Sequence, residues 1–232
     1  MTVVKRYIND FLHLFFPHNC AGCGTGILNT EDALCAECLN KLPATGFFST
    51  PGNPVEKIFY GRLNIQKAGS AFYFTKESVI QQVIIQLKYK NNPQAGAYLG
   101  KLLGAQLKNS ARFDDVDVII PMPLNDRKLF KRGYNQSGML VNGIVSVWNK
   151  PVLESAVTRT LFTETQTHKN RIARWETMEG VFEVTEPNLL SNKHVLLVDD
   201  IVTTGATLEA CGNAILKLPG SSLSLATLAY TV

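Results

Sequence analysis

The sequence predicts an α/β fold: a parallel sheet flanked by helices, with a small cysteine-rich module in front of it. Apolar segments typical of strands buried on both faces alternate with segments of helical periodicity. The most apolar strand ends in two aspartates at a tight turn, which is where open α/β sheets bind ligands. Four of the five cysteines form two close pairs near the N-terminus. We therefore expect a module over residues 1–54 and a main domain over residues 55–232.

The composition is that of a globular chain long enough for one such domain. Of the 232 residues, 45% are apolar and 18% are charged. The formal net charge of +4 suits an anionic ligand without requiring a nucleic acid. No apolar run approaches the roughly 18 residues of a membrane span, and residues 1–17 lack the apolar core and cleavage site of a signal peptide. We expect a cytoplasmic protein whose N-terminal helix packs on the body of the chain rather than on a membrane.

Two C-x₂-C motifs predict a metal site in the N-terminal module. The motifs span residues 20–23 and 35–38, and eleven residues lie between them. Motifs at this separation can bring four thiolates onto one tetrahedral Zn²⁺. Two disulfides or a redox-active pair are the alternatives, but a reducing compartment disfavours disulfides and two copies favour a metal. The expected ligands of a structural zinc ion are Cys20, Cys23, Cys35 and Cys38. The fifth cysteine, Cys211, is expected to be a small core residue.

The first elements of the main domain follow a segment rich in proline and glycine. Pro43, Pro51, Gly52 and Pro54 indicate an extended linker. Beyond it we expect a strand over residues 71–74 and helices over residues 77–89 and 95–107. Lys88 and Lys90 lie at the end of the first helix, where they either complement the helix dipole or reach toward a phosphate.

The middle of the chain carries a cluster of basic residues between two expected core strands. The strands cover residues 115–123 and 152–159, and a helix is expected over residues 138–148. The basic residues are Arg127, Lys128, Lys131 and Arg132, which crowd around Gly133. A charge run of this kind is usually a solvated surface, but its position directly after a core strand also suits a functional loop.

A polar, basic segment over residues 163–182 follows the second of these strands. A segment of this length inside a compact domain is typical of a functional lid or of disorder. Its cations Lys169, Arg171 and Arg174 could close over an anionic ligand. A surface helix from about residue 169 to residue 177 is the plainer interpretation, and it is compatible with a lid.

The clearest functional pattern lies in residues 195–208, "VLLVDDIVTTGATL". Residues 195–198 predict a buried strand, and residues 208–216 predict a helix. The turn between them would direct free backbone N–H groups and the helix dipole at one spot, which suits a phosphate. Asp199 and Asp200 would accept hydrogen bonds from the vicinal hydroxyls of a ribose, or hold a Mg²⁺. Together these features predict a ribose 5-phosphate site, and an ordinary β-turn-α unit without a ligand is the alternative. A last strand is expected over residues 222–230.

Residues 195–207 resemble the phosphoribosyl-diphosphate (PRPP) signature of type I phosphoribosyltransferases, with four apolar residues, two acidic, two apolar and a Thr/Gly run. The paired C-x₂-C motifs, "PMP" followed by "RGYNQ", and the spacing of Gln166, Arg174 and Phe182 extend the resemblance over nearly the whole chain. In this order they resemble the competence-protein F (ComF, GntX-like) family. The resemblance implies a type I phosphoribosyltransferase fold with an N-terminal zinc module, and a role in the uptake or use of DNA in some bacteria.

The resemblance also implies a role for each residue of the predicted site. Asp199 and Asp200 would be the catalytic pair and would hold the ribose hydroxyls of PRPP, which binds with Mg²⁺. The 5-phosphate would lie on Thr203, Thr204, Gly205, Ala206 and Thr207. Arg132 and Gly133 would meet the diphosphate, and Lys169, Arg171 and Arg174 would close over it.

Three functions are compatible with these residues. The first is transfer of phosphoribosyl from PRPP to an unknown acceptor, which is a pentosyltransferase activity. The second is PRPP sensing without turnover. The third is handling of single-stranded DNA, alone or with proteins of the competence machinery, through the zinc module and the basic loops.

Overall fold

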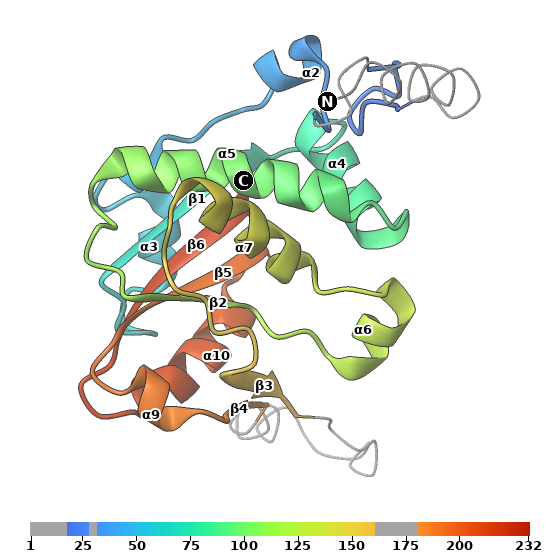
Figure 1. Ribbon diagram of the computed structural model, residues 1–232. Helices are drawn as coiled ribbons and strands as arrows, with labels where there is room; N and C mark the ends of the chain where they lie inside the picture. Colours follow the sequence, from blue (N-terminus) through green and yellow to red (C-terminus); the bar gives the residue numbers. More distant parts are fainter. Residues whose placement is uncertain (1–17, 28–31, 161–180) are drawn as a thin grey trace, which may run out of the picture.

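The computed structural model describes residues 18–27, 32–160 and 181–232. Its centre is a four-stranded, wholly parallel sheet with the strand order β1-β6-β5-β2 (Figure 1). The strands are β1 (Lys67–Phe74), β2 (Val118–Pro121), β5 (His194–Val202) and β6 (Ser222–Thr231). The expected α/β fold with a parallel sheet is confirmed. The expected N-terminal helix lies outside the described residues.

Helices cover both faces of the sheet, because successive residues of its central strands point to opposite sides. Leu196 and Val198 pack under α4 (Val79–Tyr89), α5 (Pro93–Ser110) and α7 (Gln136–Val147). Val195 and Leu197 face the other side, with residues of α3 (Pro54–Ile58) and α10 (Ala206–Leu216). Two apolar cores therefore sandwich β5, and its carboxyl end lies between the two layers of helices (Figure 1).

Asparagine and serine side chains start several of these helices. Ser78 accepts a hydrogen bond from the backbone of Gln81 at the start of α4, and Asn92 caps α5 in front of Pro93. Asn125 caps α6 (Asp126–Arg132) and Asn135 caps α7. Such caps satisfy backbone donors that have no partner within the helix. The basic cluster expected in a loop is thus largely a short helix, α6, which ends at Gly133 in the left-handed conformation.

The prediction of a second core strand over residues 152–159 is wrong. Only β3 (Val157–Arg159) is a strand, and it pairs antiparallel with β4 (Phe182–Val184), outside the main sheet. Val152 contributes a single parallel bridge to Ile119. The apolar run is broken by the exposed residues Glu154 and Ser155, so it leaves the sheet after one bridge.

The segment expected to be an extended linker is packed against the edge strand β1. Thr45 donates a backbone hydrogen bond to Ala71, and Tyr73 donates one to Pro43. Phe47 and Phe48, in the short 3₁₀ helix η1 (Phe47–Ser49), are buried. Before this segment lie the cysteine motifs and α2 (Ala36–Asn40), and the remaining short helix is α9 (Pro187–Leu190). The division between residues 1–54 and 55–232 stays a prediction.

Among the described residues, no helix combines the length and the apolar character needed to cross a membrane.

Candidate functional site

The two aspartates lie at the carboxyl end of β5, one of the two inner strands of the sheet. The strand continues past them, because Asp199 pairs with Thr227 and Val202 with Tyr230 of β6. The Asp199 carboxylate accepts hydrogen bonds from the Ser137 hydroxyl at 3.0 Å and from the backbone N–H of Asp200 at 2.8 Å. Ser137 is buried in the first turn of α7, so that helix fixes one oxygen of Asp199.

The ionisation of Asp199 is strongly perturbed. Burial, followed by the neighbouring charge of Asp200, raises the pKa of Asp199 to about 7, against the hydrogen bonds that favour its ionised form. Because the two carboxyl groups are adjacent and partly buried, ionisation of both at once is unfavourable. They therefore favour a ligand that brings hydroxyl donors or a cation to them.

A lysine of α4, on the same face of the sheet as α7, forms an ion pair with the second aspartate. Lys88 Nζ lies 2.7 Å from Asp200 Oδ2, and the two side chains are only 21% and 13% exposed. Lys88 is in the last turn of α4, which carries its charge into the site. The sequence left open a helix-dipole role and a phosphate role for Lys88; the structure shows instead a side chain directed at the acidic pair.

The turn between β5 and α10 presents the start of a helix beside the aspartates. Gly205 is the N-cap residue in the left-handed conformation, with φ 75°, and no side chain caps the helix. A Cβ at Gly205 would lie 2.7 Å from the Phe59 ring, so a side chain there would be strained and would clash. Glu209 N–H donates to the Gly205 carbonyl at 2.8 Å. The N–H groups before it, within residues 205–208, have no acceptor inside the helix.

The hydroxyl residues of this turn are accessible. Thr203, Thr204 and Thr207 are exposed, Ala206 is half-buried and Gly205 is buried. This arrangement of free N–H groups, hydroxyls and a positive helix end can receive a phosphate. The turn and the aspartates come together because they are adjacent in the chain.

The "RGYNQ" motif, residues 132–136, forms the junction between α6 and α7. Gly133 ends α6, and Asn135 both caps α7 and donates to the Met122 carbonyl at 2.9 Å. Tyr134 donates its hydroxyl to the Leu87 carbonyl at 2.5 Å, next to Lys88 in the chain. The motif therefore ties the end of α4 to the start of α7, on which Ser137 lies.

Arg132 is held at this junction. Its guanidinium donates to Gln136 at 2.7 Å and lies 5.7 Å from the centre of the Tyr89 ring. Through Gln136 it is attached to the helix turn that carries Ser137, whose hydroxyl reaches Asp199. The structure records no direct contact of Arg132 with the turn over residues 203–207. Lys169, Arg171 and Arg174 lie outside the described residues.

Sequence reasoning missed Ser137 and Arg62 as parts of this site. Ser137 follows directly on "RGYNQ", so its position near a functional motif was a usable signal. Arg62 donates to the Thr204 carbonyl at 2.8 Å from 142 residues away in the sequence, and no local pattern indicated it.

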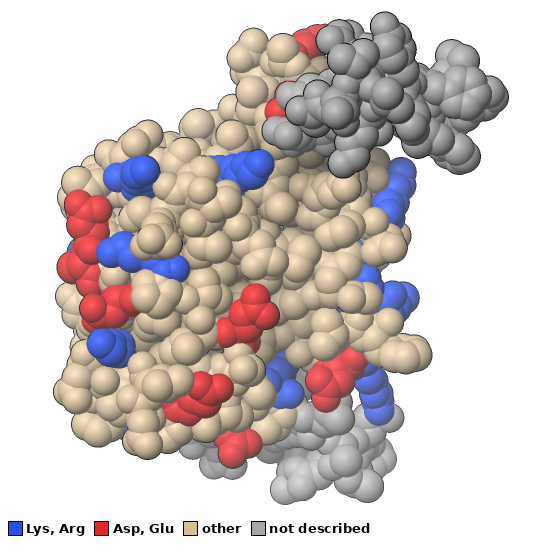
Figure 2. All heavy atoms as spheres, viewed as in Figure 1, with Lys and Arg blue, Asp and Glu red and all other residues tan. Residues whose placement is uncertain are grey.

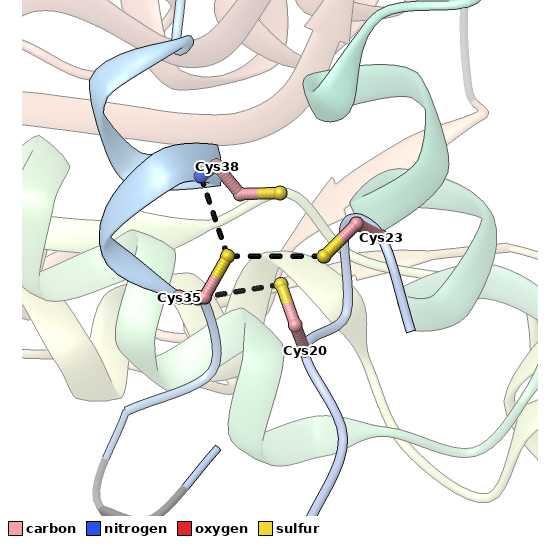
Figure 3. Close-up of side chains that lie close together, drawn as sticks. All are labelled: Cys20, Cys23, Cys35 and Cys38. Carbon is pink, nitrogen blue, oxygen red and sulfur yellow. Dashed lines mark hydrogen bonds between the residues drawn. The ribbon is translucent and has the colours of Figure 1, made fainter. Parts of the chain in front are cut away.

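The four predicted metal ligands form a cluster in the N-terminal module. The sulfur atoms of Cys20, Cys23, Cys35 and Cys38 all lie within 4.8 Å of one another and point to a common centre (Figure 3). The Cys23 and Cys35 sulfur atoms are 3.7 Å apart, and all four cysteines are free thiols rather than disulfides. Nearby His18 is not in the cluster, since its Nε2 lies 2.7 Å from the Asp32 carbonyl.

The geometry and chemistry of the cluster fit a tetrahedral metal ion. Four thiolates about 2.3 Å from a zinc ion would lie about 3.8 Å from one another, close to the observed Cys23–Cys35 separation. Backbone N–H groups of Gly22 and Cys35 donate to Cys20 Sγ, and that of Cys38 donates to Cys35 Sγ. Hydrogen bonding with Thr25 lowers the pKa of Cys23 to about 6, whereas burial raises the pKa of Cys38. A divalent cation would let both ionise.

Comparisons with known proteins agree with this fold and these residues. Residues 141–231 match the family model described as "Phosphoribosyl transferase domain". The chain is 28% identical to the DNA utilization protein YhgH of Shigella flexneri over 217 residues, 92% of this chain and 90% of that protein. It is 24% identical to Competence protein F of Haemophilus influenzae, over 88% of this chain and 93% of that protein. Competence protein ComFC of Bacillus subtilis is 30% identical over 100 residues, 43% of this chain and 38% of that protein.

Among solved structures, a glutamine PRPP amidotransferase from B. subtilis aligns with a TM-score of 0.44 and 16% identity, over 62% of this chain and 30% of that longer chain. The relatives named for competence and DNA use span nearly the whole chain, and the phosphoribosyltransferase match covers the acidic pair and the turn after it. These similarities agree with the resemblance of the sequence to the competence-protein F (ComF) family of phosphoribosyltransferase-like proteins.

Proposed function

We propose that the protein binds PRPP at the carboxyl end of β5 and transfers its phosphoribosyl group to an acceptor. The 5-phosphate lies on the turn over residues 203–207, and Asp199 and Asp200 accept the ribose hydroxyls. One observation carries the proposal: a partly buried acidic pair at the end of a central parallel strand stands beside a glycine-opened helix start. That pair and that helix start match the hydroxyl and phosphate ends of one ribose 5-phosphate.

The transfer requires no covalent bond between the protein and the substrate. The bond from the anomeric carbon to the diphosphate breaks, the diphosphate leaves with the bonding electrons, and the acceptor forms the new bond to that carbon. The residues must therefore orient the sugar and stabilise the separating charges. Asp199, fixed by Ser137, holds the ribose in place, and a negative pair beside the ring favours the cationic sugar of the transition state. Mg²⁺ bound with the diphosphate would neutralise the leaving group.

Lys88 and Arg132 supply the positive side of this proposal. Lys88 pairs with Asp200, and Arg132 lies at the adjoining junction of α6 and α7. A guanidinium offers two parallel donors, which suits a diphosphate. We place the diphosphate toward Arg132 and Gly133 for this reason, together with the family resemblance of the "RGYNQ" motif.

Release of pyrophosphate from PRPP and Mg²⁺, followed with a panel of nucleobases and amines, tests the transfer. We expect acceptor-dependent release that Asp199→Asn abolishes and that the exposed-site variant Glu154→Gln retains. PRPP binding without release for any acceptor would favour a PRPP sensor. Absence of binding as well as release would overturn the proposal.

The cysteine cluster is proposed to hold one structural Zn²⁺. Four thiolates leave no open position for water, so this ion would stabilise the N-terminal module rather than take part in catalysis. The relatives' names connect the family with competence and DNA use, and we propose the same setting for this chain.

A second function, binding of single-stranded DNA, is favoured by the surface of α6. Phe130 is 94% exposed between Lys128 and Lys131, and Tyr89, 71% exposed, lies under Arg132. Figure 2 shows Lys and Arg side chains along the edge of the molecule that carries α6. Exposed aromatic rings among cations are the usual means of binding single strands, because bases stack on the rings while cations follow the phosphates.

A salt titration of oligonucleotide binding tests this second function. Phe130→Ala should weaken binding by about 1–3 kcal/mol if a base stacks there. Leu189→Ala, which removes an exposed apolar side chain from α9, is the matched control and should have no effect. Equal affinity of the Phe130→Ala variant and the wild type would exclude α6 as the binding surface.

A further inference from the structure

A segment over residues 58–63, which we call the supporting segment, packs against the turn over residues 203–207. Phe59 is fully buried, and its ring lies where a side chain at Gly205 would be. Leu63 stands in the same relation to Gly212 of α10, where a Cβ would lie 2.8 Å from the leucine. The supporting segment precedes β1 and lies outside the family match over residues 141–231.

Arg62 connects this segment to both sides of the turn. Its Nη1 donates to the carbonyls of Thr204 at 2.8 Å and Ile58 at 3.2 Å. Its Nη2 donates to Glu209 Oε2 at 2.5 Å. One guanidinium thus holds the peptide just before the start of α10 and a carboxylate in the first turn of that helix.

The bond to Thr204 fixes the direction of a backbone N–H group. In a trans peptide the carbonyl oxygen and the following N–H point in opposite directions, and the described residues contain no cis peptide. Because the Thr204 carbonyl points to Arg62, the Gly205 N–H points away from Arg62 and from the supporting segment. Glycine tolerates many backbone conformations, so without this bond the peptide could turn and present its carbonyl oxygen to an anion.

The bond to Glu209 removes an unfavourable charge. A carboxylate in the first turn of α10 stabilises the free helix, but it would repel a phosphate at the same helix end. Arg62 is its ion-pair partner, with side-chain exposures of 39% for Arg62 and 22% for Glu209. Both contacts of Arg62 therefore prepare the turn for an anion without requiring Arg62 to touch it.

We propose that Arg62 is the positioning residue of the phosphate turn: it fixes the peptide between Thr204 and Gly205 so that the Gly205 N–H faces the 5-phosphate. The inference rests on the proposed PRPP site and adds a residue to it from outside the phosphoribosyltransferase match. It concerns the 5-phosphate alone and makes no claim on the diphosphate.

Calorimetry with ribose 5-phosphate and with PRPP and Mg²⁺ tests the proposal. Arg62→Ala should weaken both ligands equally, by about tenfold, because each carries the 5-phosphate and loses one donor directed at it. Arg62→Lys keeps the charge but has a single donor group, so it should recover part of the affinity. Lys57→Ala, which removes an exposed cation of α3 just before the supporting segment, should bind as the wild type does.

The double variant Arg62→Ala/Glu209→Gln separates orientation from charge. If Arg62 acts by fixing the peptide, removing the carboxylate leaves affinity low. Recovery of full affinity would overturn the orientation role. Thermal unfolding identifies variants that lose the fold. If Arg62→Ala does not fold, Arg62→Lys is tested instead, and we expect it to bind both ligands at least threefold more weakly than the wild type. Wild-type affinity in a folded Arg62 variant would overturn this inference alone, whereas a wild type that binds neither ligand would overturn the proposed PRPP site itself.

Discussion

At the scale of single residues, the surroundings of the Asp199 carboxyl group disfavour its ionised form. Burial and the charge of Asp200 raise the pKa of Asp199 from 3.8 to about 7. Between those values the folded protein keeps a proton that the unfolded chain has lost, so Asp199 lowers stability as pH rises through this window. Ionised Asp199 therefore lowers the free energy of unfolding.

Replacing Asp199 by Asn should remove this pH dependence. The amide keeps the size of the side chain and an acceptor for Ser137. At pH 8 we expect the free energy of unfolding of ligand-free Asp199→Asn to exceed that of the wild type by at least about 1.4 kcal/mol, with the two nearly equal at pH 4. Urea unfolding over this pH range measures it, and Asp114→Asn at an exposed position is the control. A constant difference across the range would contradict the assigned pKa.

Arg132 gives a second prediction at the residue scale. If it meets the diphosphate, Arg132→Ala should weaken PRPP binding at least tenfold, since a charge-assisted bond contributes about 1.5–3 kcal/mol. Ribose 5-phosphate, which lacks the diphosphate, should bind within about twofold of the wild type. Lys131→Ala, at the exposed neighbouring position, controls for net charge. Equal losses for both ligands would show that Arg132 acts through the fold of the α6–α7 junction.

At the scale of elements, the site depends on how closely α5 and α7 cross. A Cβ at Gly143 of α7 would lie 2.0 Å from the Ala97 carbonyl oxygen, and one at Gly100 of α5 would lie 2.1 Å from the Leu140 carbonyl oxygen. The backbones of the two helices therefore touch at these glycines. Since α7 carries Ser137, this crossing sets the position of the hydroxyl that holds Asp199.

Gly143→Ala should separate the two helices and destabilise the protein. We expect a loss of about 1–3 kcal/mol in the free energy of unfolding, the usual effect of overpacking a core. Gly138→Ala in the same helix is the matched control, because the new Cβ would be 3.6 Å from its nearest neighbour, an ordinary contact. Chemical denaturation of both variants measures the effect, and equal stabilities would contradict the close crossing.

The N-terminal module gives a second prediction at the scale of elements. Protein purified without added zinc should contain about one zinc ion per chain. Cys35→Ser and Cys38→Ser should each reduce the zinc content, whereas Cys211→Ser, at a buried cysteine of α10, should not. Metal analysis of the purified variants decides this. A metal-free protein whose first 54 residues are fully folded, or one with two disulfides, would contradict the zinc site.

At the scale of the whole molecule, features formed by contiguous residues could be predicted from the sequence, whereas contacts between distant segments could not. The parallel sheet followed from uninterrupted apolar strands such as residues 195–198, and the acidic pair and phosphate turn followed because they are adjacent in the chain. The pairing of Lys88 with Asp200 and the support from Arg62 could not be derived, because they depend on how layers far apart in sequence meet. The strand expected over residues 152–159 failed because apolar content alone does not show whether a segment reaches the sheet.

The acidic pair at the end of β5 is the central claim, and PRPP binding measured by calorimetry in the presence of Mg²⁺ tests it most directly. Replacing Asp199 and Asp200 together by Asn keeps their shape and removes their charge. We predict that the double variant binds PRPP more weakly by at least about 2 kcal/mol, while Asp114→Asn/Glu154→Gln, which removes two exposed charges, binds as the wild type does. Unchanged PRPP affinity in the folded Asp199→Asn/Asp200→Asn protein would place the ligand elsewhere and contradict the account.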